Sequence, residues 1–173
     1  MSNLARIGFG LLVLFSMTTT GWPADSATLD SWPQLLGNAR HSGNQPGVAL
    51  PENLGLVAAI PLTDAILAAP VSGKGKIFVV DGSGVVHAID SSTLQVVWRY
   101  ETRGGAGNCN NVSTPALIDN YLHVGTTAGL YYVLNAENGQ LVREIDCGEP
   151  ILSAPVVAQD RVYFATLGAR VFA

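Results

Sequence analysis

The two cysteines have the clearest chemical options in this sequence. Cys109 and Cys147 lie six and eight residues before Pro115 and Pro155, in what are expected to be related connections. In an exported protein an isolated thiol pair can form a disulfide. Their spacing leaves open whether the two thiols are bonded, because a disulfide requires Cα atoms within about 7 Å of each other.

Three histidines are scattered, and their positions favour packing over metal ligation. His87 aligns with Tyr132, and His123 with Phe78, when the chain is compared with itself at a spacing of 45 residues, while His41 lies outside this pattern. Positions shared with aromatic residues belong to strands, and no second ligand lies close in sequence. We therefore expect no metal site.

The loop "TRGGAGNCNN" (102–111) is rich in glycine and asparagine. Its glycines are not followed by a helical pattern, so a phosphate-binding loop is not indicated and an extended surface loop is expected. Asn111-Val112-Ser113 fits the glycosylation acceptor pattern, a match short enough to arise by chance.

Composition sets the fold class. The 173 residues are 48% hydrophobic and 13% charged, include 19 Gly and 9 Pro, and carry a net charge of −4. This charge offers no basic face, so nucleic acid binding is excluded. Sparse charge with many turn formers and β-branched residues predicts an all-β chain.

The first residues resemble a targeting segment. Residues 1–24 contain Arg6, an apolar run from Ile7 to Met17 and a small polar region, which is the layout of a signal peptide. The run is too short to span a bilayer, although a membrane anchor or a buried helix is the alternative. We expect an exported protein, periplasmic or extracellular, without stable membrane insertion, and an N-terminal extension over 25–52.

The rest of the sequence repeats. A shift of 45 residues superposes Pro70 on Pro115 and Asp90 on Asn135, and a further shift of 40 brings Pro155 into line. Each copy contains several short β-branched runs joined by turn residues. A repeat of this length with about four strands predicts a β-propeller blade and is favoured over a β-sandwich, which needs no fixed period.

Residues 88–98, "AIDSSTLQVVW", resemble the tryptophan-docking motif A-x-[DN]-x-x-T-G-x-x-x-W of the pyrroloquinoline quinone (PQQ)-like repeat family, with Leu94 in place of glycine. The second copy keeps Asn135 and Gly139 but has Arg143 in place of tryptophan. The resemblance implies that Trp98 packs against the neighbouring blade. It assigns structural and not catalytic roles to Trp98, Ala88, Asp90, Thr93, Asn135 and Gly139.

The resemblance also divides the chain. Residues 53–173 are expected to form an incomplete propeller of about two and a half four-stranded blades, with a ring-closing strand at 53–60, blades at 66–101 and 113–146, and the start of a third at 152–173. Closed propellers have about 4–8 blades, so further blades or domains are expected after residue 173. A truncated gene, or a small protein that closes by oligomerising, is the alternative.

Two functions follow from this resemblance. The first is an exported, non-catalytic scaffold that binds other proteins and has no cofactor. The second is a fragment of a PQQ- and calcium-dependent dehydrogenase. The second function needs a vicinal cysteine pair, calcium ligands and a catalytic aspartate, and none can be assigned here, so the scaffold is preferred.

Overall fold

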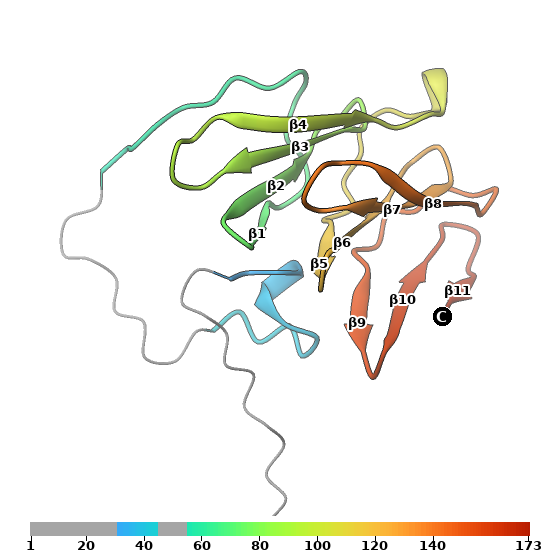
Figure 1. Cartoon of the computed structure of the whole chain (residues 1–173). Coiled ribbons are helices and arrows are strands. Elements are labelled where there is room, and N and C mark those ends of the chain that lie inside the picture. The colour runs from blue at the N-terminus through green and yellow to red at the C-terminus, as the bar shows by residue number, and fades with distance from the viewer. Residues whose placement is uncertain (1–30, 45–54) are drawn as a thin grey trace, which may run out of the picture.

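Three antiparallel sheets make up the protein in the computed structural model, which describes residues 31–44 and 55–173 (Figure 1). The strands follow one another in chain order within each sheet. The first sheet contains β1 (Val71–Gly73), β2 (Lys76–Val80), β3 (Val85–Asp90) and β4 (Val96–Glu101). The second contains β5 (Ala116–Ile118), β6 (Tyr121–Gly125), β7 (Leu130–Asn135) and β8 (Leu141–Asp146). The third contains β9 (Val156–Ala158), β10 (Arg161–Ala165) and β11 (Val171–Phe172).

The only helical elements in the described residues are two 3₁₀ turns, η1 (Leu35–Gly37) and η2 (Gly105–Gly107), so the all-β prediction is confirmed. In the part of the chain that the structure describes, no helix has the length and apolar character needed to cross a membrane.

The same turn closes the central hairpin of each sheet. It requires a backbone φ in the left-handed region at one position, where Gly84 has 83° and Gly129 has 82°. The third sheet has Ala169 there, with a φ of 64°. A side chain in this region costs about 1 kcal/mol, so the third turn is less favourable than the first two.

The core lies between the faces of the sheets. Phe78 and Ala88 of the first sheet and Leu122 and Tyr132 of the second share one fully buried apolar cluster. Between the second and third sheets, the rings of Tyr131 and Phe164 stack with centroids 4.1 Å apart. Each sheet therefore buries its apolar residues by packing on the next one, as propeller blades do.

The N-terminal segment crosses the inner strands of all three sheets. The backbone of Trp32 pairs with Ser72 in β1, and the Pro33 carbonyl accepts a hydrogen bond of 2.7 Å from Leu117 N in β5. Gln34 Oε1 then accepts one of 3.3 Å from Val157 N in β9. We call residues 32–34 the strap; it is blue in Figure 1, next to the inner strands.

The ring-closing strand expected at 53–60 is not formed over 55–60, where Leu56 and Val57 are 88% and 86% exposed. A strand needs a partner edge for its backbone groups, and no described sheet provides one to this segment. β1–β4 and β5–β8 lie within the ranges expected for two blades, and β9–β11 within 152–173. The expected signal peptide at 1–24 lies outside the described residues.

Candidate functional site

Trp98 lies in the interface between the first two sheets. Its indole Nε1 donates a hydrogen bond of 3.1 Å to the carbonyl of Ala136, in the turn that follows β7. A Cβ atom added at Gly139 would lie 2.6 Å from the indole ring. Phe78 packs on the other side of this contact, with its ring centroid 5.9 Å from that of Trp98. The indole N–H and ring thus join the two sheets.

Asp90 shapes the turn before β4. Its Oδ1 accepts hydrogen bonds from the backbone N–H groups of Ser92 (2.9 Å) and Thr93 (2.8 Å) and from both hydroxyls. The Ser92 hydroxyl, followed by the two backbone donors, lowers the pKa of Asp90 to about 2. Leu94 takes the position of the motif glycine, with a φ of 59°. Ala88, which is fully buried, pairs across the sheet with Trp98.

Asn135 holds the equivalent turn of the second sheet. Its Oδ1 accepts hydrogen bonds from the N–H groups of Glu137 (2.8 Å) and Asn138 (3.3 Å), and Gly139 keeps a φ of 73°. The motif residues thus build the turns onto which a neighbouring ring docks. The Oδ1 atoms of Asp90 and Asn135 serve these turns.

The second sheet has a different surface where it faces the third. Strand register places His123, Val133 and Arg143 where the first sheet has Phe78, Ala88 and Trp98. His123 is buried, its Nδ1 is 3.0 Å from the Tyr131 hydroxyl, and burial lowers its pKa to about 4. These side chains border a groove of about 320 Å³ beside Val162 and Phe172.

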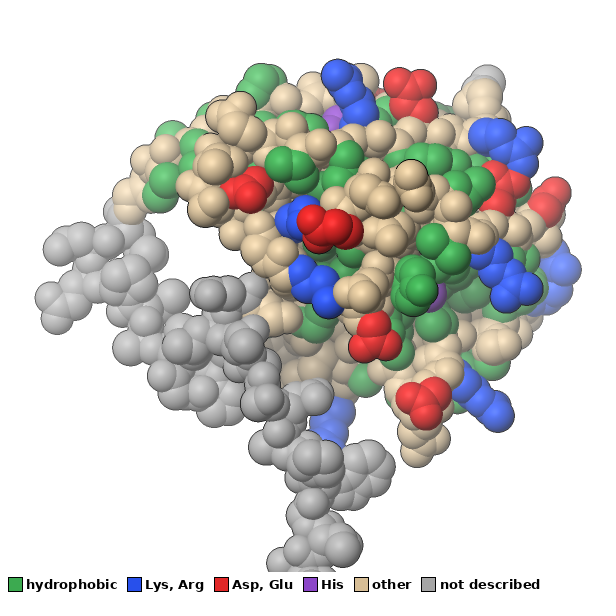
Figure 2. Space-filling model, viewed as in Figure 1, with side chains coloured by type: hydrophobic (Ala, Val, Ile, Leu, Met, Phe, Trp, Pro, Cys, Tyr) green, Lys and Arg blue, Asp and Glu red, His purple; other side chains and the backbone are tan. Residues whose placement is uncertain are grey.

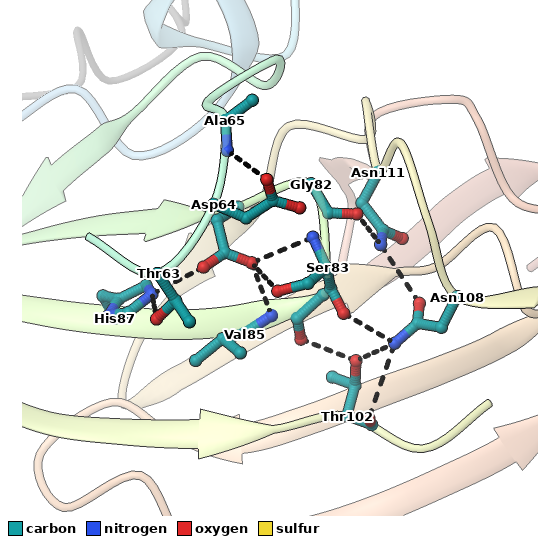
Figure 3. Close-up of polar contacts among 12 residues, drawn as sticks. Thr63, Asp64, Ala65, Gly82, Ser83, Val85, His87, Thr102, Asn108 and Asn111 are labelled. Carbon is teal, nitrogen blue, oxygen red and sulfur yellow. Dashed lines mark hydrogen bonds and ion pairs between the residues drawn. The ribbon is translucent and has the colours of Figure 1, made fainter. Parts of the chain in front are cut away.

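The first sheet also contains a buried acid–base pair, Asp81 and His87; Figure 3 labels His87 together with Ser83 and Val85, which contact Asp81. His87 Nε2 is 3.0 Å from Asp81 Oδ2, and the two residues are 3% and 0% exposed. The second oxygen of Asp81 accepts hydrogen bonds from Val85 N (2.9 Å) and from the N–H and hydroxyl of Ser83. Burial raises the pKa of Asp81, but the hydrogen bonds from His87, Val85 and Ser83 outweigh it and leave this pKa below its ordinary value.

The other two sheets show what this position does. Thr126 and Thr166 replace Asp81 in the corresponding turns, where the backbone N–H of each donates to the carbonyl four residues later, as that of Asp81 does. The hydroxyl of Thr126 lies 3.2 Å from Leu130 N, the counterpart of the Asp81 contact with Val85. Since threonine can hold the same turn, the Asp81 carboxylate is a turn-forming group.

The loop at 102–111 is held by two asparagines (Figure 3). Asn108 Nδ2 donates to Thr102 Oγ1 (2.7 Å), and Asn111 Nδ2 donates to the carbonyl of Gly82 (3.1 Å). Asn111 Oδ1 accepts from Thr127 N of the second sheet (2.9 Å). Asn111 is 1% exposed, so its glycosylation pattern does not mark an accessible acceptor. The expected extended loop is thus a link between two sheets.

The two cysteines are free thiols in the structure, so the disulfide considered for Cys109 and Cys147 is not formed. Cys147 is 4% exposed and packs with Tyr131 and Phe164 between the second and third sheets. Cys109 is exposed on the loop, where its carbonyl accepts a hydrogen bond from Thr127 Oγ1 (2.8 Å). One thiol therefore lies in a core and the other on the surface.

The described residues do not fit PQQ and calcium. The two thiols are not adjacent in sequence. The buried carboxylate of Asp81 has both oxygens engaged inside its own sheet. Among the described residues, no three His, Cys, Asp or Glu side chains gather closely enough to hold a metal ion. Their buried side-chain nitrogen and oxygen atoms all have hydrogen-bond partners.

Sequence reasoning assigned His87 and His123 to buried strand positions, and the structure buries both. It did not single out Asp81, and it placed the strap only within the N-terminal extension expected over 25–52. The signal for Asp81 was the turn "DGSG" with a histidine three residues after it, which places the two side chains on one face of a hairpin. The contacts of the strap with the three sheets were not predicted, because each of them involves a single strap residue.

Sequence comparison shows that this chain is similar to outer membrane protein assembly factors. A family model described as outer membrane protein assembly factor BamB matches residues 112–173. The assembly factor BamB of Shewanella oneidensis is 36% identical over 105 residues, which cover 56% of this chain. The chain spans 27% of the length of that relative.

Solved structures similar to this chain are propellers. Quinohemoprotein alcohol dehydrogenase from Comamonas testosteroni matches with a TM-score of 0.62 and 23% identity, over 82% of this chain and 24% of that one. BamB from Moraxella catarrhalis matches with a TM-score of 0.58 and 21% identity, over 65% of this chain and 38% of that one. A europium-containing methanol dehydrogenase matches with a TM-score of 0.67 and 17% identity, over 78% and 27%.

At these identities the structural similarity establishes the fold alone. The three sheets are blades of an incomplete β-propeller, as the sequence predicted. Together with the matches to BamB, the repeats show that this chain is similar to the PQQ-like β-propeller repeat family.

Proposed function

We propose that this chain belongs to an exported, non-catalytic β-propeller that binds other proteins. The observation that carries the proposal is the state of the Asp81–His87 pair. The pair is buried, both carboxylate oxygens are engaged, and threonine replaces Asp81 in the next two blades. A general base must reach the proton that it removes, and this carboxylate reaches only its own blade.

The surface supports a protein partner. Lys, Arg, Asp and Glu side chains are interspersed on the face shown in Figure 2, without a large area of one sign. The curated relative is named as an outer membrane protein assembly factor, which supports a role in assembling proteins of the cell envelope. The apolar run near the N-terminus supports export, with the periplasm as the proposed compartment.

The alternative is a fragment of a PQQ-dependent dehydrogenase. Two structural neighbours are alcohol and methanol dehydrogenases, but a fold hosts many functions, and their sequence identity to this chain is low. The proposal includes no cofactor.

The test is a titration of the mature natural protein with PQQ and calcium, followed by tryptophan fluorescence, together with dye reduction in the presence of alcohols or sugars. We expect no saturable quinone binding and no substrate-dependent dye reduction. Quinone-dependent turnover that is abolished by a substitution without a change in melting temperature would replace this proposal with the dehydrogenase.

A further inference from the structure

We propose that Leu67, Val112 and Leu152 form a docking surface for a polypeptide segment that carries apolar side chains flanked by Lys or Arg. This inference rests on the proposed function, whose partner it describes. We call these three residues the apolar row.

The three residues occupy one position of the repeat. Each precedes by three residues the proline that leads into the inner strand of its blade. They are 50%, 40% and 41% exposed. The residues that follow Leu67 and Val112, Ala68 and Ser113, are buried. Three copies therefore place an apolar side chain in water at a position where the fold does not pack it.

Hydrogen bonds hold the three connections side by side. Ala69 N donates to Thr114 Oγ1 (3.2 Å), which joins the first connection to the second. Ser113 Oγ donates to the Ser153 carbonyl (2.7 Å), which joins the second to the third. Because these bonds lie one or two residues from the apolar row, its three side chains are neighbours on one surface.

A fourth apolar residue extends the row. Leu167 is 68% exposed, and its N–H donates to the Pro150 carbonyl (2.8 Å), two residues before Leu152. Contiguous exposed apolar side chains with a polar surround are typical of protein interaction sites.

The charges near the row specify the partner. Arg103 of the second connection pairs with Glu144, and Arg170, in the turn between β10 and β11, pairs with Glu149. Asp64 and Asp146 are exposed and have no ion-pair partner among the described residues. The net charge of the chain is −4. This balance repels anionic lipid and nucleic acid and complements basic residues beside an apolar segment.

The experiment measures the fluorescence anisotropy of labelled octapeptides added to the mature protein. One peptide alternates Leu and Lys, and the other alternates Leu and Glu. The docking variant combines Leu67→Ser, Val112→Ser and Leu152→Ser. The matched control combines Val97→Ser, Leu141→Ser and Val142→Ser on outer strands, where the original residues are 50%, 45% and 54% exposed.

We expect saturable binding of the Leu–Lys peptide, weakened about tenfold or more in the docking variant and less than about twofold in the control. The Leu–Glu peptide should bind about tenfold more weakly. Melting temperatures should show that both variants fold.

Equal losses in the two variants, equal affinity for the two peptides, or no saturable binding would each overturn the docking surface. None of these outcomes bears on quinone turnover. The quinone titration fails only if the non-catalytic function is wrong, so the two failures are distinguishable.

Discussion

The indole of Trp98 lies over Gly139 of the next blade, close enough that a Cβ atom there would be 2.6 Å from the ring. The two residues come from adjacent copies of the same motif, and each needs the other. The tryptophan supplies a large apolar surface, and the glycine leaves the space that this surface fills.

Trp98→Ala should lower the free energy of unfolding by about 3–5 kcal/mol, because it leaves a cavity between two blades. Gly139→Ala should cost at least about 1 kcal/mol, because alanine is strained at a φ of 73° and its methyl group meets the ring. Urea unfolding followed by circular dichroism measures both. The double variant should be less destabilised than the sum of the two single variants, and strict additivity would contradict the contact.

His123 should make stability depend on pH. Burial lowers its pKa from 6.5 to about 4, so the unfolded chain binds this proton first as the pH falls. The stability that neutral His123 contributes is therefore fully present above pH 6.5. It is lost progressively as the pH falls toward 4, by about 3 kcal/mol at most. His123→Phe, which copies Phe78 of the first blade, should flatten this part of the profile measured by thermal melting. An unchanged slope in this variant would show that another group titrates.

Asp81→Ala should destabilise the chain by about 2–4 kcal/mol, because Val85 N loses its side-chain acceptor and His87 is left buried without the carboxylate. Asp81→Thr should recover part of this loss, because Thr126 holds the same turn in the second blade. Chemical denaturation compares the two variants. If Asp81→Thr is as destabilised as Asp81→Ala, the aspartate has a role that the turn does not explain.

The two thiols should react at different rates. Cys109 is exposed and should react with a maleimide in the native protein, whereas burial shields Cys147 and, as the largest cause, raises the pKa of its thiol. Mass spectrometry of labelled peptides before and after addition of denaturant gives the order. A peptide pair linked through the two cysteines in non-reduced material would contradict the free thiols.

The repeat was predictable because each copy carries its own turn residues at a fixed spacing. Asp90 and Asn135 recur with that spacing, and both form the turns that precede an outer strand. The Asp81–His87 pair was harder to predict, since neither residue recurs in the other copies. The unpaired state of 55–60 followed from a missing partner edge and not from its own residues, which have the apolar pattern of a strand.

The strap determines the order in which this fold can be completed. Its first contact joins residues 40 apart in sequence, and its last, between Gln34 and Val157, joins residues 123 apart. The strap precedes all three blades in the chain, so it must wait for the third blade before all three of its contacts exist. Contacts of such separation form slowly and late. Until then the inner edges of β5 and β9 lack their strap partners, so a chaperone or a misplaced strand would compete with native folding at these edges.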